Sequence, residues 1–294
     1  MKKRGILFFI CFAILTLVSC GQQKSMEKPH PLFGVIQNGK YGYIDNTGKI
    51  VINPKFEDAG NFSEGLARVK IGSKYGYINK TGKIVINPQF DTAGDFSEGL
   101  ALVMIGGKLG YIDKTGKIII NPKFNNALDF SEELARVKIG GKYGYIDNTG
   151  KIIIDSKFED ALDFSEGLAR VMISGKWGYI DKAGKITINP KFEDALDFSE
   201  GLARVMIGGK YGYIDNTGKI VINSQFDNAW DFYEGLARVM IGGKWGYIDN
   251  TGKIVINPQF DGARNFSEGL AGFKIGGKYG YIDKTGKYVW NPTK

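Results

Sequence analysis

Residues 176–209 read KWGYIDKAGKITINPKFEDALDFSEGLARVMIGG, and most of the chain repeats this stretch. Each copy begins with a lysine, an aromatic residue or leucine, and a glycine, and the copies follow one another every 34 residues without insertion. Because self-similarity at a fixed period indicates stacked structural units, the structure of one copy decides the fold. The initial lysines are Lys40, Lys74, Lys108, Lys142, Lys176, Lys210, Lys244 and Lys278.

Each copy holds the residues of three antiparallel strands. Residues 211–215 and 219–223 are rich in strand-forming residues. Between them, Asp215 and Gly218 occupy the first and fourth positions of a type I turn. The preceding segment, residues 202–207, alternates between two faces, and Gly208-Gly209 after it suits a tight hairpin. We therefore predict a three-stranded antiparallel meander.

A connector of about twelve residues joins each meander to the next and carries the pattern Phe-x-x-Ala-x-x-Phe in all seven copies. Phe192, Ala195 and Phe198 are one example. A spacing of three predicts a single helical or 3₁₀ turn with these residues on one side. We expect the phenylalanines to fill the core between neighbouring sheets, where burial of each contributes about 2–3 kcal/mol.

The count of meanders sets the fold class. Counting from Leu32 gives eight, at residues 32–54, 66–88, 100–122, 134–156, 168–190, 202–224, 236–258 and 270–292. We predict an all-β repeat domain over residues 32–294, in which eight three-stranded meanders form a propeller-like array stabilised by nearest-neighbour contacts. An open β-solenoid is the alternative, because no exchange of strands between the two ends is evident to seal a ring.

The 34-residue period and the sequence motif of each copy resemble the WG, or KWG, repeat family of bacteria, and this resemblance covers residues 32–294. The tryptophan of that name occurs only at Trp177 and Trp245; tyrosine replaces it in five copies and Leu109 in one. The resemblance implies an extracytoplasmic or interaction-type repeat domain without a defined activity.

Composition narrows the function classes. The 294 residues are 43% hydrophobic and include 42 glycines, which suits a folded chain with many turns. The chain has a single histidine, His30, and two cysteines, which argues against a histidine-based triad, a multi-histidine metal site and a disulfide framework. We expect no catalytic residue, no metal site and no cofactor.

The N-terminus has the features of an export signal. Lys2, Lys3 and Arg4 precede an apolar run over residues 6–18, which is shorter than the roughly 20 residues of a membrane span. Residues 17–20, Leu-Val-Ser-Cys, resemble the lipobox of bacterial lipoproteins. This resemblance implies a signal peptide over residues 1–19, lipidation of Cys20 and a polar tether over residues 20–31.

Location follows from the same resemblance. More than one acyl chain on Cys20 would give a stable membrane anchor. Gly21 and Gln22 follow the cysteine, and neither is the aspartate that retains lipoproteins in the inner membrane. We therefore expect a lipid-anchored protein of the bacterial cell envelope, placed in the outer membrane if the organism is Gram-negative.

Several charged patterns resemble parts of phosphate, calcium or glycosidase sites, but they recur from copy to copy. The Asp-x-Thr-Gly-Lys stretches lack the first glycine and the final hydroxyl residue of a phosphate loop, and they lack the aspartate density of calcium loops. Glu159, Asp160, Asp163 and Glu166 suggest the paired carboxylates of a glycosidase, yet the same acids recur one copy later. Recurrence favours a structural role, such as pairing with the repeated arginines Arg68, Arg136, Arg170, Arg204 and Arg238.

The positive charge does not predict a nucleic-acid partner. The formal net charge is +8, and the lysines are spread over all copies with nearly as many acids. Nucleic-acid binding requires a concentrated basic stripe, so we expect none.

Positions that break the repeat are the best candidates for binding. Trp230 stands where other copies have leucine or glycine, and Tyr233 stands where they have serine. With Trp177 and Trp245 they are the candidate binding aromatics, since exposed aromatic side chains commonly anchor protein or sugar ligands. We expect a non-enzymatic repeat surface that binds an unidentified protein or glycan. The alternative is a carbohydrate-active enzyme, which needs two carboxylates about 5–10 Å apart.

Overall fold

The computed structural model describes residues 31–293, so the signal peptide, Cys20 and most of the tether lie outside the described residues. Every regular element from Phe33 to Thr293 is a β-strand, and no helix suited to crossing a membrane occurs in this part of the chain. The strands are β1 (Phe33–Gln37), β2 (Lys40–Ile44), β3 (Ile50–Phe56), β4 (Asp58–Ala59), β5 (Leu66–Ile71), β6 (Lys74–Asn79), β7 (Ile84–Phe90), β8 (Thr92–Ser97), β9 (Leu100–Ile105), β10 (Lys108–Asp113), β11 (Ile118–Phe124), β12 (Ala135–Ile139), β13 (Lys142–Ile146), β14 (Ile152–Phe158), β15 (Asp160–Ser165), β16 (Leu168–Ile173), β17 (Lys176–Asp181), β18 (Ile186–Phe192), β19 (Asp194–Ala195), β20 (Leu202–Ile207), β21 (Lys210–Asp215), β22 (Ile220–Phe226), β23 (Asn228–Tyr233), β24 (Leu236–Ile241), β25 (Lys244–Asp249), β26 (Ile254–Phe260), β27 (Gly262–Ala263), β28 (Leu270–Ile275), β29 (Lys278–Asp283) and β30 (Tyr288–Thr293).

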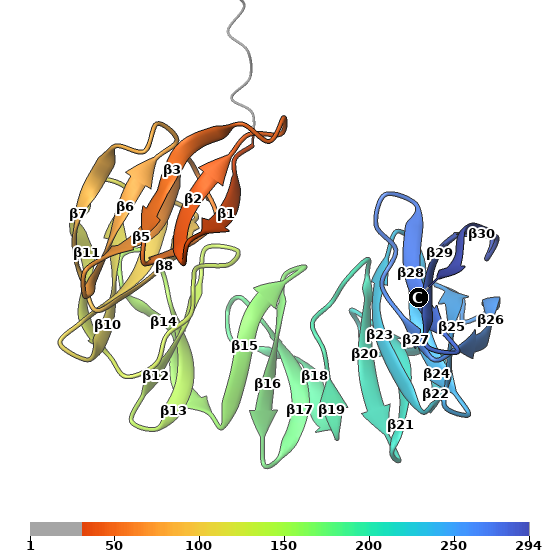
Figure 1. The fold of residues 1–294 in the computed structure, drawn as a ribbon. Coiled ribbons are helices and arrows are strands. Elements are labelled where there is room, and N and C mark those ends of the chain that lie inside the picture. The colour runs from red at the N-terminus through yellow and green to blue at the C-terminus, as the bar shows by residue number, and fades with distance from the viewer. Residues whose placement is uncertain (1–30, 294) are drawn as a thin grey trace, which may run out of the picture. The chain divides into compact units, whose positions relative to one another are not determined.

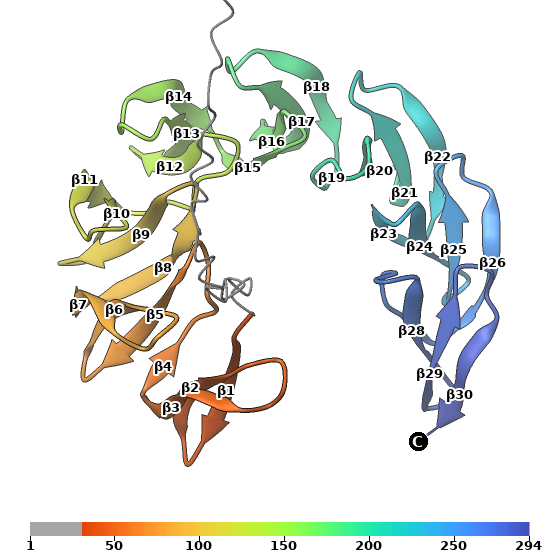
Figure 2. The ribbon, with the colours of Figure 1, turned by 90° about the horizontal axis from the view of Figure 1, so that it is seen from above.

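These strands form eight antiparallel sheets that follow one another in chain order, here numbered one to eight (Figure 1). Sheets one (β1–β3) and four (β12–β14) have three strands, and the other six have four. Within the described residues no strand of sheet one pairs with sheet eight (β27–β30), so the array is open. Figure 2 shows the third meander strands, such as β11 and β18, on the outside of the array and the connectors on its inside. The predicted all-β repeat fold is confirmed.

The connector differs from its prediction. It forms no helical turn; instead it is extended, and in six sheets it adds a fourth strand beside the next meander. In sheet six Ala195 pairs with Val205, and the Leu196 N–H donates to the Arg204 carbonyl at 2.9 Å. A shift of register between Ala161 and Phe164 shows how an extended connector still turns residues three apart to the same side. The pattern Phe-x-x-Ala-x-x-Phe therefore marks an irregular strand.

Both predicted hairpins are present. The Gly218 N–H donates to the Asp215 carbonyl at 2.9 Å, and Gly218 has a φ of 83°. The Asp215 side chain fixes this turn, because its Oδ1 accepts hydrogen bonds from Thr217 Oγ1 at 2.6 Å and from the Lys219 N–H at 3.1 Å. At the other end of the meander Gly208 and Gly209 have φ values of 60° and 72°, which suits the two-residue turn between β20 and β21.

The glycine of the Trp-Gly and Tyr-Gly pairs has a steric reason. At Gly178 an added Cβ would lie 2.6 Å from the Ile188 carbonyl oxygen and 2.6 Å from the Pro190 nitrogen. Strand β18 crosses this closely because its pairing with β17 is irregular between Trp177 and Tyr179. The equivalent glycines from Gly42 to Gly246 meet the same backbone positions, so any larger residue there would push the outer strand away.

The core lies between successive sheets. Tyr179 of sheet five is fully buried; its hydroxyl donates to the Leu196 carbonyl of the next connector at 2.7 Å, and its ring centroid lies 5.0 Å from that of Phe198. The connector phenylalanines are all buried except Phe62, which is half-buried. Each buried cluster takes its members from two neighbouring sheets, as predicted for stacked repeats.

Candidate binding site at sheets seven and eight

Arginines on the inner strands contact the neighbouring sheets, and together with the acids beside them they are called here the arginine ladder. Its arginines are Arg68, Arg136, Arg170, Arg204 and Arg238. The Arg204 Nη1 donates to the Ala229 carbonyl of the following sheet at 2.5 Å, and the Arg170 Nε lies 3.0 Å from Asp197 Oδ1 of the following sheet. Arg68 pairs with Asp95 and Arg136 with Asp160 of the following sheet, whereas Arg204 pairs with Asp194 of its own sheet. The predicted pairing of the recurring acids with the arginines is therefore present at four arginines.

Three acids at one connector position of successive copies have raised pKa values for a shared reason. Burial raises the pKa of Asp163 to about 6, against the opposing effect of the Arg136 guanidinium. Burial also raises the pKa of Asp197 and of Asp231 in the next two sheets. Because three successive copies show the same shift, the environment belongs to the repeat and singles out no one acid.

The ladder breaks at the last two sheets. Arg238 of sheet seven has Asn265 at the position that Asp197 holds opposite Arg170, so a neutral amide replaces the carboxylate. One copy later Gly272 replaces the arginine itself. Sheet eight therefore lacks two of the charges that hold the earlier sheets together.

A third substitution adds positive charge at the same place. Arg264 occupies the connector position of Trp230, which is glycine or leucine in the five earlier copies. An added Cβ on Gly272 would lie 3.4 Å from Arg264 Cδ and 3.7 Å from Tyr281 Cε1. The arginine of the connector thus lies over the gap that the missing ladder side chain leaves.

The structure places the four candidate aromatics in two environments. Trp230 and Tyr233, both on β23, are 40% and 43% exposed, whereas Trp177 and Trp245 are each only 9% exposed. The Arg238 Cζ lies 4.4 Å from the Trp230 ring centroid and 5.4 Å from that of Trp245, so these two rings share one guanidinium. Trp177 lies two sheets earlier and packs near the ladder arginine of its own sheet.

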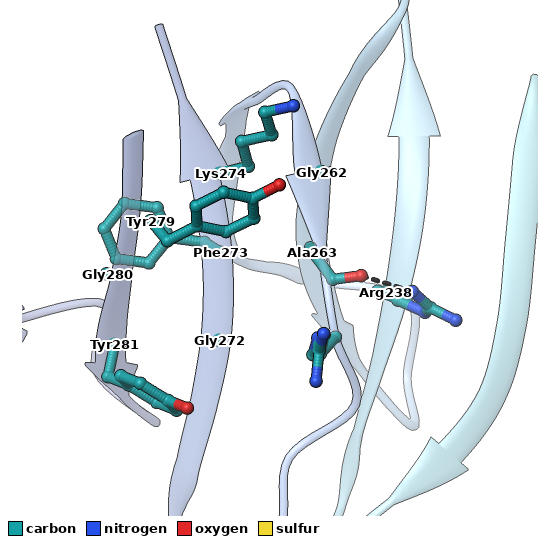
Figure 3. Close-up of a pocket in the computed structure, with 10 residues that line it drawn as sticks. Arg238, Gly262, Ala263, Gly272, Phe273, Lys274, Tyr279, Gly280 and Tyr281 are labelled. Carbon is teal, nitrogen blue, oxygen red and sulfur yellow. Dashed lines mark hydrogen bonds between the residues drawn. The ribbon is translucent and has the colours of Figure 1, made fainter. Parts of the chain in front are cut away.

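A pocket of about 520 Å³ opens beside this cluster. Arg238, Arg264 and Lys274 supply its positive charges, and Tyr279 and Tyr281 supply exposed rings. Figure 3 shows the two tyrosine rings on strand β29 and the hydrogen bond from Arg238 to the Ala263 carbonyl. No carboxylate lines the pocket. Burial lowers the pKa of Arg238, so an anion beside it would be favoured.

Sequence reasoning did not assign these pocket residues. The signal was the loss of the ladder arginine at Gly272, visible only when that row is followed through every copy. The rings of Tyr279 and Tyr281 could not be singled out, because their equivalents in earlier sheets have the same sequence context. Among residues 31–293, no group of three or more histidine, cysteine or acidic side chains is arranged to hold a metal ion.

Comparison with solved structures supports the architecture. A crystal structure described as a eukaryotic initiation factor is similar with a TM-score of 0.62 and 11% identity over 90% of this chain and 86% of that chain. The dihydro-heme d1 dehydrogenase NirN has a TM-score of 0.49 and 13% identity over 90% of this chain and 75% of its own. At 11% identity the likeness to the initiation factor shows the fold alone. A search of curated proteins found no matching relative.

The model of the WG containing repeat matches the chain seven times in succession. The matched residues are 41–75, 75–108, 110–143, 143–177, 177–211, 211–245 and 245–279. These matches cover most of the chain and share the 34-residue period of the sheets described above. The chain therefore belongs to the WG containing repeat family.

Proposed function

We propose that this chain is a non-enzymatic binding protein of the bacterial cell envelope, anchored by lipid at Cys20 and displaying its repeat surface to a protein or glycan partner. The observation that carries the proposal is the exposure of Trp230 and Tyr233 on the inner strand of sheet seven. In the two preceding sheets, leucine (Leu162 and Leu196) stands at the position of Trp230, and serine stands at the position of Tyr233. Two large aromatic side chains left open to solvent suit ligand contact better than packing.

The binding role is tested by returning these two positions to the sequence of their neighbours. Trp230→Leu and Tyr233→Ser introduce into sheet seven the residues that other sheets have at these positions, so the double variant is expected to fold. The detergent-solubilised full chain is used to capture partners from envelope extract and is applied to a glycan array. We expect the unaltered chain to capture a partner and the double variant to lose it.

A matched control separates binding from folding. Trp177→Tyr also removes a tryptophan, but at a buried position where most copies already have tyrosine. This variant is expected to bind as the unaltered chain does. Equal capture by the double variant and the unaltered chain would refute a role for the exposed aromatics, and no capture by the unaltered chain would refute the binding function itself.

The anchor is tested separately. Cys20→Ala removes the thiol that lipidation requires, so the chain is expected to move from the membrane fraction to the soluble fraction and to lose labelled-palmitate incorporation. A Cys11→Ala variant alters the other cysteine of the chain and should leave both readouts unchanged. Retention of Cys20→Ala on the membrane would contradict the lipoprotein assignment.

One observation favours the alternative of a carbohydrate-active enzyme. A carboxyl group with a pKa of about 6, as at Asp163, suits a general acid. The recurrence of its environment in sheets six and seven weighs against this, because a catalytic pair is one asymmetric site. If the unaltered chain hydrolyses envelope polysaccharides and Asp163→Asn abolishes this activity, the enzyme would be preferred to the binding protein.

A further inference from the structure

We propose that the pocket of sheet eight binds an acidic sugar, a hexuronic acid unit of a glycan, whose carboxylate lies between Arg238 and Arg264 and whose ring stacks on Tyr279 or Tyr281. This inference rests on the proposed binding function and names the ligand class for it. It concerns different side chains from the exposed pair Trp230 and Tyr233.

The first argument is charge. In sheets five and six a ladder arginine meets a carboxylate, as Arg170 meets Asp197 at 3.0 Å. Arg238 instead has the neutral Asn265 at the corresponding position, and among the described residues it is the one repeated arginine without an ion pair to an acid. A guanidinium without a carboxylate partner recognises a planar carboxylate well, because it offers parallel N–H groups. The ligand carboxylate would restore the charge that the ladder lacks here.

The second argument is the set of charged side chains around the Arg238 guanidinium. Arg264 brings another guanidinium over Gly272, and Lys274 adds an ammonium group, while no acid lines the pocket. Such a site attracts an anion and discriminates against neutral ligands of the same shape. Its volume of about 520 Å³ lies within the range of about 300–1,000 Å³ typical of small-ligand sites.

The third argument is the pair of open rings. Tyr281 is 51% exposed, whereas its counterparts Tyr213 and Tyr247 are 1% exposed and donate hydrogen bonds to the next connector. Tyr279 is 58% exposed and lies with Tyr281 on the same side of β29 (Figure 3). Sugar rings pack their apolar faces on aromatic rings, so a charged sugar matches both halves of this lining.

The test uses variants that restore residues found in other copies. Asn265→Asp returns the carboxylate opposite Arg238, and Gly272→Arg returns the ladder arginine into the pocket. Each is expected to fold, because earlier sheets carry that residue and the nearest atoms to the new Cβ at Gly272 lie at contact distance. Arg68→Leu is the control: it removes a guanidinium from a paired position, as Leu102 does naturally.

Binding is measured by calorimetry with the detergent-solubilised chain and tetragalacturonate as the probe. The neutral maltotetraose and inorganic sulfate are run in parallel. We expect tetragalacturonate to bind, both comparison ligands to bind at least about tenfold more weakly, and Asn265→Asp and Gly272→Arg each to weaken tetragalacturonate binding by about tenfold or more, the equivalent of one hydrogen bond to a charged group. Arg68→Leu should bind as the unaltered chain does.

Other outcomes overturn the inference. Equal affinity for maltotetraose would refute the need for a carboxylate, and equal affinity for sulfate would reduce the site to an adventitious ion only. Full binding by both pocket variants would place the ligand elsewhere. Capture of an envelope partner that depends on Trp230 but not on the pocket variants, without tetragalacturonate binding, would refute this inference alone and leave the proposed function standing.

Discussion

Phe164→Ala tests whether neighbouring sheets hold one another through the connector phenylalanines. Phe164 lies on β15 of sheet five, is 2% exposed, and its ring centroid lies 5.0 Å from that of Tyr145 in sheet four. Its side chain therefore belongs to the core between two sheets.

The expected cost follows from burial and cavity formation. Truncation of a buried phenylalanine to alanine costs about 3–5 kcal/mol, because the lost transfer free energy adds to that of the cavity left behind. Stability in a stacked array is mainly a sum over repeats and their interfaces, so the loss should be local. We expect urea denaturation of the chain to show this loss and hydrogen exchange to show reduced protection in β13, β15 and β16, with β24 and β25 unaffected.

Phe62→Ala provides the matched control. It removes the same ring at the same position of the repeat, and its centroid lies 4.8 Å from that of Tyr43, but Phe62 is only half-buried. Its cost should be smaller than that of the buried residue, since the transfer free energy scales with the area removed from water. Equal costs for Phe62→Ala and Phe164→Ala, or a loss of protection spread evenly over all sheets, would refute the reasoning.

Three further predictions concern other parts of the repeat. Tyr179→Phe leaves the part-buried Leu196 carbonyl without its donor, so the free energy of unfolding should fall by about 0.5–1.5 kcal/mol in urea titrations, and no change would contradict this hydrogen bond. Burial raises the pKa of Asp163 from 3.8 to about 6, so the folded chain binds more protons than the unfolded chain between these values and loses stability as the pH rises through them. The asparagine of Asp163→Asn does not titrate, so the free energy of unfolding of this variant should rise relative to that of the unaltered chain by about 1 kcal/mol from pH 4 to pH 7, a figure that allows for solvent screening. A difference in urea midpoints that stays constant over this pH range would contradict the raised pKa. Gly178→Ala places a Cβ 2.6 Å from the Pro190 nitrogen, so it should cost at least about 1–3 kcal/mol in the same titrations, and a neutral effect would show that β18 can move aside.

The sequence was sufficient for features that a single copy determines. The turn at Asp215–Gly218 and the double-glycine hairpin depend on local backbone preferences, and both are present as predicted. The burial of the phenylalanines also followed, because a small meander needs neighbours to form a core. The number of sheets then follows from the number of copies.

The connector shows where spacing was misleading. A period of three suggested a helical turn, but an irregular strand also turns residues such as Ala161 and Phe164 to one side. Hydrogen bonds from the connector to the following meander strand decide for the extended form. Such bonds join residues from different parts of the copy, which a local pattern does not contain.

The candidate site shows a second limit. The repeat breaks at Trp230 and Tyr233 were visible in the sequence, and the structure leaves both exposed. The pocket was not visible, because it results from an absent side chain at Gly272 together with a guanidinium from the connector at Arg264. The pairing of the connector with β28 inside sheet eight brings these two positions together, and the Arg264 N–H donates to the Gly272 carbonyl at 2.8 Å.

The central claim is that repeated positions hold the array together and that positions breaking the repeat bind the partner. The most direct measurement compares partner capture and urea stability for the unaltered chain and for one in which sheets seven and eight are returned to the repeat. The changes are Trp230→Leu, Tyr233→Ser, Arg264→Leu, Asn265→Asp and Gly272→Arg. We predict that this chain keeps its stability and loses capture. Undiminished capture by a stable restored chain would contradict the account.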